Sequence, residues 1–154
     1  MDKKLFIFDL DFTLWDAGGE WCDCNQPPYY RRKGEVFDSR GANIMLYPDV
    51  KKILNELQRH EKIIAIASRT SAPTNAIELL NLFNISVFFH FKEIFPGSKI
   101  QHMNNLSRRS GVCFKEMVFF DDEMRNIHDT SSLGIQSIYV EDGIKFHHII
   151  NFLN

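Results

Sequence analysis

Cysteine is scarce in this chain of 154 residues, which contains only Cys22, Cys24 and Cys113. Three is an odd number and too few to hold a small fold together, so a disulfide scaffold is excluded and we expect a reducing, cytoplasmic setting. The Cys22-x-Cys24 pair has no second cysteine pair and no nearby histidine to complete a metal site, which argues against a soft-metal centre there.

The sequence also lacks long apolar runs and an excess of positive charge. No run approaches the roughly 20 apolar residues of a membrane-spanning helix, and the short apolar run near the N-terminus ends at Asp9 and Asp11, unlike a secretory signal. The 18 basic and 20 acidic side chains give a net charge of −2, without the basic surplus of a nucleic-acid-binding domain. We therefore expect neither a membrane nor a nucleic-acid partner, and a single domain over residues 1–154.

Short apolar runs alternate with helical patterns along most of the chain. Runs at 4–8, 62–67 and 117–120 predict strands buried on both faces, and 135–140 and 87–94 predict two more, the last less clearly marked. Apolar residues at helical spacing follow each run, in segments that begin near residues 50, 76, 100, 124 and 146. Strands that alternate with helices predict an α/β fold with a parallel sheet between two helical layers, an αβα sandwich.

Residues 16–47 interrupt this alternation. They contain Gly, Pro and two strand-like stretches near 35–38 and 42–47, which predicts a β-hairpin flap inserted after the first strand. Two features of the flap leave alternatives open. Trp21 could stack on an aromatic substrate group or simply pack against the fold. The basic run 31–33 could steer an anionic substrate or belong to a solvated loop.

Polar residues follow the predicted strands where each strand ends. These residues are Asp9 and Asp11, Ser68 and Arg69, Lys99, and Asp121 and Asp122. Taken singly, each has an ordinary explanation as a turn, a helix cap or a surface side chain. Because the carboxyl ends of parallel strands meet at one edge of a sheet, we expect all of them to converge on one crevice.

The types of residue in this set indicate phosphate chemistry. Four carboxylates in a small space repel one another unless a cation joins them, and Mg²⁺ binds few carboxylates while leaving room for a substrate phosphate. Ser68, Arg69 and Lys99 supply the hydroxyl, guanidinium and ammonium groups that bind phosphoryl oxygens. One carboxylate can then attack phosphorus while another transfers protons, so we expect a magnesium-dependent hydrolase of phosphate monoesters.

The segment Asp9–Leu14 (DLDFTL) resembles the first motif of the haloacid dehalogenase (HAD) superfamily, and Ser68, Lys99 and Asp121-Asp122 match its second, third and fourth motifs in order. Several longer blocks resemble the magnesium-dependent phosphatase family, a group of acid phosphatases, over about residues 5–145. These blocks are DLDFTLW from residue 9, LYP from 46, ASRTS from 67, PGSK from 96 and FFDDE from 119, with Arg125-Asn126 extending the last.

This resemblance implies a role for each matching position. Asp9 is expected to be the nucleophile that forms an aspartyl-phosphate, and Asp11 the general acid and base. The remaining roles concern binding: Mg²⁺ by the Asp9 side chain, the Asp11 backbone carbonyl and Asp122 with Asp121 close behind, and the phosphoryl oxygens by the Leu10 backbone, Ser68, Arg69 and Lys99.

The resemblance also implies a Rossmann-like fold with strand order 3-2-1-4-5, a small flap and no large cap domain. The implied substrates carry phosphotyrosine-type or sugar (ketosamine-type) phosphates, although the acidic, Gly-rich segment 16–20 departs from the family pattern and leaves substrate preference open. Three rivals stay open. Asp11 argues against a dehalogenase, the absence of space for a cap argues against a phosphotransferase, and the complete set of catalytic residue types argues against a non-catalytic module that binds phosphorylated ligands.

Overall fold

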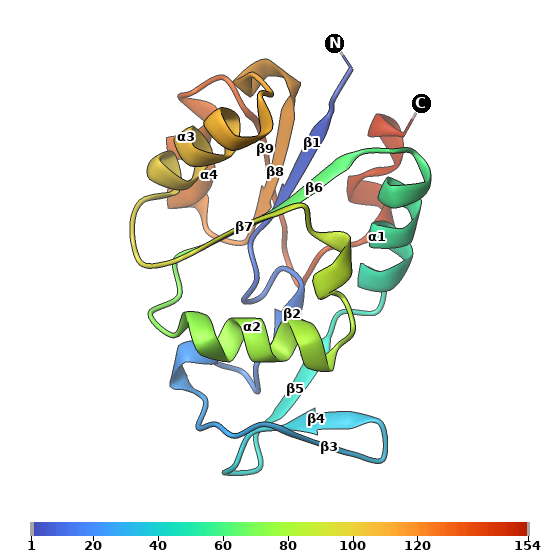
Figure 1. The fold of residues 1–154 in the computed structure, drawn as a ribbon, viewed down its shortest axis with the longest axis vertical. Coiled ribbons are helices and arrows are strands. Elements are labelled where there is room, and N and C mark those ends of the chain that lie inside the picture. The colour runs from blue at the N-terminus through green and yellow to red at the C-terminus, as the bar shows by residue number, and fades with distance from the viewer. Residues whose placement is uncertain (1, 154) are drawn as a thin grey trace.

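Five parallel strands form the central sheet of the structure, a computed structural model that describes residues 2–153 (Figure 1). The strands are β1 (Leu5–Phe8), β6 (Ile63–Ser68), β7 (Phe91–Ile94), β8 (Met117–Asp121) and β9 (Gln136–Tyr139). Their spatial order, β7-β6-β1-β8-β9, confirms the expected order 3-2-1-4-5. β1 therefore lies at the centre, where Leu5 pairs with Ile63 on one side and Met117 on the other.

Helices cover both faces of this sheet, as the alternation of patterns predicted. The four helices are α1 (Val50–Arg59), α2 (Pro73–Leu82), α3 (Lys99–Ser110) and α4 (Met124–Ser131). Successive side chains of β1 point to opposite faces, so that Phe6 and Phe8 pack with α1 and α2 while Leu5 and Ile7 pack with α3 and α4. A central strand buried on both faces explains the continuous apolar run in the sequence.

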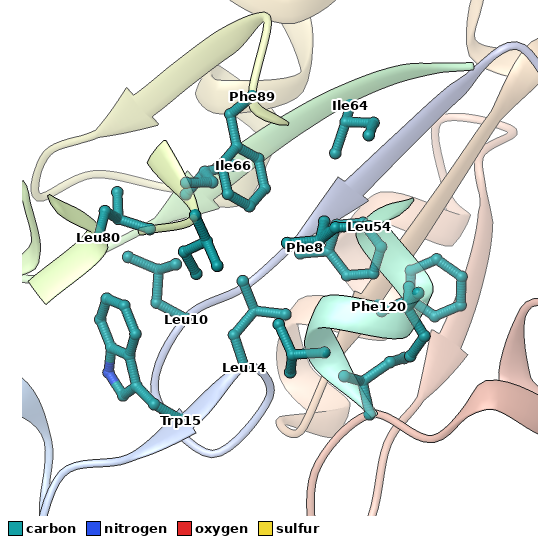
Figure 2. Close-up of a cluster of buried hydrophobic side chains, with 14 of the residues drawn as sticks. Phe8, Leu10, Leu14, Trp15, Leu54, Ile64, Ile66, Leu80, Phe89 and Phe120 are labelled. Atoms are coloured by element: carbon teal, nitrogen blue, oxygen red, sulfur yellow. The ribbon is translucent and has the colours of Figure 1, made fainter. Parts of the chain in front are cut away.

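The larger core lies between the sheet, α1 and α2 (Figure 2). Phe8 stacks on Phe120 with ring centroids 5.0 Å apart. The indole of Trp15 is fully buried at the margin of the drawn cluster, and its ring lies 6.2 Å from that of Phe83. The chain directly after β1 is therefore anchored in the core rather than free in solvent.

The flap is a small antiparallel sheet rather than a simple hairpin. Its strands are β2 (Trp15–Asp16), β3 (Tyr30–Arg32), β4 (Glu35–Phe37) and β5 (Asn43–Leu46), in the order β2-β5-β4-β3. The predicted pair at 35–38 and 42–47 is confirmed as β4 and β5, and the sheet is extended by β3 and β2, which the sequence pattern did not mark. Figure 1 shows this sheet below the carboxyl ends of the central strands.

Two predicted elements differ from the structure. A strand was expected over 87–94, but only residues 91–94 form one, β7. Residues 86–88 form a 3₁₀ turn instead, in which Val87 is exposed. The helix expected from residue 146 to the end is instead two 3₁₀ turns, 146–148 and 150–152, since its hydrogen bonds join residues three apart, such as Leu153 N–H to the Ile150 carbonyl. Within residues 2–153 no helix is long and apolar enough to cross a membrane.

Gly143 provides a test of how tightly the loop after β9 packs. Its φ is +84°, and a Cβ built there would lie 2.3 Å from the ring of Tyr47. The next residue, Ile144, donates its N–H to the Thr13 carbonyl at 2.9 Å, so the loop cannot shift freely. We expect Gly143→Ala to lower the free energy of unfolding by about 2–5 kcal/mol, the sum of left-handed backbone strain and overpacking, as measured by urea denaturation.

Gly34→Ala is the matched control for this experiment. Gly34 has φ +80°, but a Cβ there would meet nothing within 4 Å. Its substitution should cost about 1–2 kcal/mol from backbone strain alone. Equal losses in the two variants would contradict the role assigned to the Tyr47 contact.

Candidate active site

An open cavity of about 170 Å³ lies at the carboxyl ends of β1, β6 and β8. Six of the predicted residues line it: Asp9, Asp11, Ser68, Arg69, Lys99 and Asp122. The cavity sits where the strand order reverses around β1, which is the usual ligand site of an open α/β sheet. The structure thus brings together polar residues that are up to about a hundred positions apart in the sequence.

Three of the four predicted carboxylates form a compact group. One oxygen each from Asp9, Asp121 and Asp122 lie within 4.8 Å of one another. Asp121, the last residue of β8, is fully buried beneath the cavity. Asp11 lines the same cavity, as expected, but its side chain lies outside this group, whereas Asp121 belongs to the group and does not line the cavity.

The ammonium of Lys99 contacts two of these three carboxylates. Its Nζ lies 3.0 Å from Asp9 Oδ1 and 3.3 Å from Asp121 Oδ2, and it also donates to the Ala67 carbonyl. Burial opposes a charge on Lys99, which is 1% exposed, but the two carboxylates outweigh burial and raise its pKa. Lys99 is the first residue of α3, a helix start at which Ser98 accepts a hydrogen bond from the Gln101 N–H.

The carboxylates themselves are held in an environment that disfavours their charge. Burial, followed by the neighbouring charge of Asp9, raises the pKa of Asp121 to about 6 and that of Asp122 to about 9. Burial also raises the pKa of Asp9, although Lys99 acts in the opposite direction. Three oxygen donors that repel one another at close range fit a hard divalent cation such as Mg²⁺, which would relieve this repulsion.

Asp11 has different partners. Its Oδ1 accepts hydrogen bonds from the Trp15 indole N–H and from the Cys22 backbone N–H, both at 2.9 Å. Burial raises the pKa of Asp11, while these two hydrogen bonds act in the opposite direction. Neither hydrogen bond was predicted from the sequence. The one from Cys22 joins the segment after β1 to the flap, and the one from Trp15 depends on the turn between the two residues.

The end of β6 supplies a hydroxyl group, that of Ser68, and a guanidinium group, that of Arg69, to the cavity. Ser68 is almost fully buried, and Arg69 Nη1 donates to Asn126 Oδ1 at 3.3 Å. Asn126 in turn donates from Nδ2 to Asp121 Oδ2 at 3.0 Å, so one amide links the guanidinium to the carboxylate group. The side chain of Leu10 lies in the core, so a role for this residue in binding can involve only its backbone.

Six further residues line the cavity: Trp21, Asp23, Thr70, Glu123, Arg125 and Asn126. Trp21 is the flap residue for which two alternatives were open, and its side chain stays half exposed at the cavity. Arg125 and Asn126, which extend the FFDDE block of the sequence, lie in the first turn of α4, although no role was assigned to them from the sequence. The basic run Arg31–Lys33 does not line the cavity.

Comparisons with known proteins agree with this geometry. The model of the acid phosphatase family matches residues 3–154. Magnesium-dependent phosphatase 1 of Homo sapiens is 44% identical over 144 residues, which cover 92% of this chain and 80% of that protein. A HAD-like hydrolase superfamily protein of Schizosaccharomyces pombe is 37% identical over 145 residues, which cover 86% and 82% of the two chains.

Among solved structures, that of a candidate phosphatase from Clostridium difficile superposes with a TM-score of 0.73. The match covers 96% of this chain and 89% of the other at 19% identity, so it supports the fold alone. The family match extends over almost the whole sequence, and the relatives share much of their length with it. This chain belongs to the acid phosphatase family of the haloacid dehalogenase superfamily.

Proposed function

We propose that this phosphatase hydrolyses phosphate monoesters in two steps through a phosphorylated Asp9. The observation that carries the proposal is the position of Asp9, whose carboxylate lies at the cavity in contact with the Lys99 ammonium and beside Asp122. A carboxylate nucleophile must approach a phosphoryl group that is itself negatively charged, so it needs cations on the same side. Lys99 supplies one such charge from within the protein.

Magnesium is the cofactor that fits the remaining charge. Asp9 and Asp122 would hold it through their side chains and Asp11 through its backbone carbonyl, with Asp121 behind them. The human relative is named as magnesium-dependent, which supports the same assignment. When bound, the ion neutralises charge on the phosphoryl group and on the carboxylates around it.

Ser68, Arg69 and the backbone of Leu10 are assigned to the phosphoryl oxygens. In the first step, Asp9 attacks phosphorus while Asp11 gives a proton to the leaving oxygen. In the second step, Asp11 accepts a proton from the water that hydrolyses the phosphorylated Asp9. Asp11 is suited to both steps because it lies outside the three-carboxylate group and has a pKa raised by burial.

The substrate's organic group would extend towards the flap and α4. Trp21 offers an aromatic face there, while Arg125 and Asp23 offer charges of both signs. These groups suit a phosphotyrosine-type or ketosamine-type substrate, in which a ring or a polar chain follows the phosphate. The assignment of such substrates rests on the cavity's lining and on the family resemblance.

Substitution of the two carboxylates tests the proposed roles. Asp9→Asn should abolish turnover, because an amide cannot act as the nucleophile. Asp11→Asn should lower kcat/KM by about 10²–10⁴-fold for an alkyl phosphate, and much less for p-nitrophenyl phosphate, whose leaving group departs without protonation. The measurement is kcat/KM for both substrates with magnesium, because this ratio reports the first step and not the hydrolysis of phosphorylated Asp9 that all substrates share. Circular dichroism confirms that each variant is folded. Equal losses for both substrates in Asp11→Asn would contradict the acid role.

Thermal unfolding tests the carboxylate group without measuring activity. The pKa values of Asp121 and Asp122 are raised above 3.8, to about 6 and about 9. Between these limits the folded chain keeps protons that the unfolded chain has lost, so the free energy of unfolding falls as the pH rises. We expect the Tm of the magnesium-free protein to fall between about pH 4 and pH 9, by about 2–4 °C for each kcal/mol lost. Added magnesium should restore most of the lost Tm, because the bound ion would take the place of the protons.

Asp122→Asn is the matched control for this measurement, because an amide of the same shape has no proton to lose. The difference in Tm between this variant and the wild type isolates the contribution of Asp122 from that of the rest of the protein. The variant should show a flatter pH dependence and a weaker response to magnesium. An unchanged pH dependence in Asp122→Asn would contradict the raised pKa.

The flap provides a test of substrate selection. Trp21 lines the cavity, whereas Tyr30, another exposed aromatic residue of the flap, stacks on Phe37 away from it. Trp21→Ala should raise KM for aryl phosphates by roughly 5–150-fold, the equivalent of about 1–3 kcal/mol, and leave small alkyl phosphates nearly unchanged. Tyr30→Ala should change neither. If Trp21→Ala weakened both classes of substrate equally, the residue would support the fold or the phosphate site instead.

A further inference from the structure

The carboxyl group of Asp11 is held asymmetrically. Both of its hydrogen bonds, from the Trp15 indole and from the Cys22 amide, end on Oδ1. The Cys22 thiol also lies near this carboxyl group, but among the described residues no hydrogen bond to Oδ2 accompanies the two that end on Oδ1. The two oxygens of this carboxyl group therefore differ in their environment, although they are chemically equivalent in a free side chain.

The Trp15 donor is fixed by a tight turn and by the core. The Leu10 carbonyl accepts the N–H groups of Thr13 and Leu14 at 3.0 and 2.8 Å, and Phe12 adopts φ +61° between them. This turn brings Trp15 back beside Asp11, and the fully buried indole packs towards Phe83. A non-glycine residue in the left-handed region costs about 1–2 kcal/mol, so the surrounding packing must enforce the turn.

The Cys22 donor is fixed by α2 and by the flap. Its carbonyl accepts hydrogen bonds from Asn75 Nδ2 at 3.0 Å and from the Tyr29 hydroxyl at 3.5 Å. Its thiol is buried 3.7 Å from the Thr70 hydroxyl, and burial raises the pKa of that thiol, so it stays neutral. These contacts hold the carbonyl and the thiol of Cys22 in place, and so restrict the adjoining Trp21–Cys22 peptide group, whose N–H reaches Asp11.

We infer that the Trp15 indole and the Cys22 backbone amide are positioning groups for Asp11, which hold Oδ1 as an acceptor and so reserve Oδ2 for proton transfer. This inference rests on the proposed function, in which Asp11 is the general acid and base. It also gives the flap a second task. Besides covering the substrate, the flap supplies one of the two donors that orient a reacting side chain.

The proton balance of the two steps explains why two donors on one oxygen help. In the first step, the proton on Oδ2 passes to the bridging oxygen as the bond from that oxygen to phosphorus breaks and the bond from Asp9 to phosphorus forms. Asp11 is then an anion, and part of its charge lies on Oδ1, where the two N–H groups stabilise it. In the second step, Oδ2 takes a proton from the attacking water. Without the donors, rotation of the carboxyl group could place either oxygen towards the substrate.

The test removes the indole N–H without changing the shape of the side chain. β-(3-Benzothienyl)alanine, placed at residue 15 by site-specific incorporation, has sulfur in place of the N–H. We expect kcat/KM for an alkyl phosphate, which reports the first step, to fall about tenfold, equivalent to about 1.4 kcal/mol. For p-nitrophenyl phosphate, kcat/KM should change by less than about twofold. Trp15→Phe provides a second variant that also lacks the donor, and it should show the same ratio of losses.

Phe83→Leu is the matched control, since it loosens the packing near Trp15 but keeps the N–H donor. It should lower Tm without changing the ratio of the kcat/KM values for the two substrates. The inference is overturned if Phe83→Leu reproduces the substrate dependence, or if the benzothienyl variant loses activity equally on both substrates or not at all. Asp11→Asn separates the two hypotheses. If that variant shows the substrate dependence and the benzothienyl variant does not, the inference alone fails, and if neither shows it, the proposed function fails as well.

Discussion

The contact of the Lys99 ammonium with Asp9 and Asp121 is the constraint on which the rest of the site depends. A buried ammonium is unfavourable unless carboxylates accompany it, and buried carboxylates are unfavourable unless a cation accompanies them. Each group therefore requires the other two. Because Asp9 follows β1, Asp121 ends β8 and Lys99 begins α3, this contact joins the centre of the sheet to the helical layer that covers one face. The fold and the site are stabilised through the same charges.

The Lys99 ammonium does not neutralise the three carboxylates, and the negative charge that remains can bind a cation. One ammonium faces three carboxylates, and the raised pKa values of Asp121 and Asp122 show that the protein alone does not satisfy them. One ammonium and three carboxylates have a formal charge of −2, which one divalent cation would balance. A phosphoryl dianion without the cation would meet the uncompensated carboxylates, so the arrangement favours its binding together with the ion, next to the guanidinium of Arg69.

Most of the central sheet could be predicted because its strands are buried on both faces, which leaves continuous apolar runs such as Leu5–Phe8. The residues at the cavity could be predicted because they directly follow those runs. The strand over 87–94 was overextended because its apolar residues include the exposed Val87, which periodicity alone cannot distinguish from a core residue. The contacts of Asp11 with Trp15 and Cys22 could not be predicted, since they depend on the left-handed turn at Phe12 and on the path of the flap. Both are tertiary features without a local sequence signal.

The basic run Arg31–Lys33 has a consequence far from the cavity. Within residues 2–153, β3 pairs only with β4, so its outer edge has no partner strand there, and all three of its residues are exposed. A free edge of this kind is a template on which another chain can add a strand and begin to aggregate. Two arginines on β3 and a lysine in the turn after it place like charges along this edge, so two copies of the chain that approach through it repel each other. Charges that do not line the cavity thus protect the flap from intermolecular strand pairing.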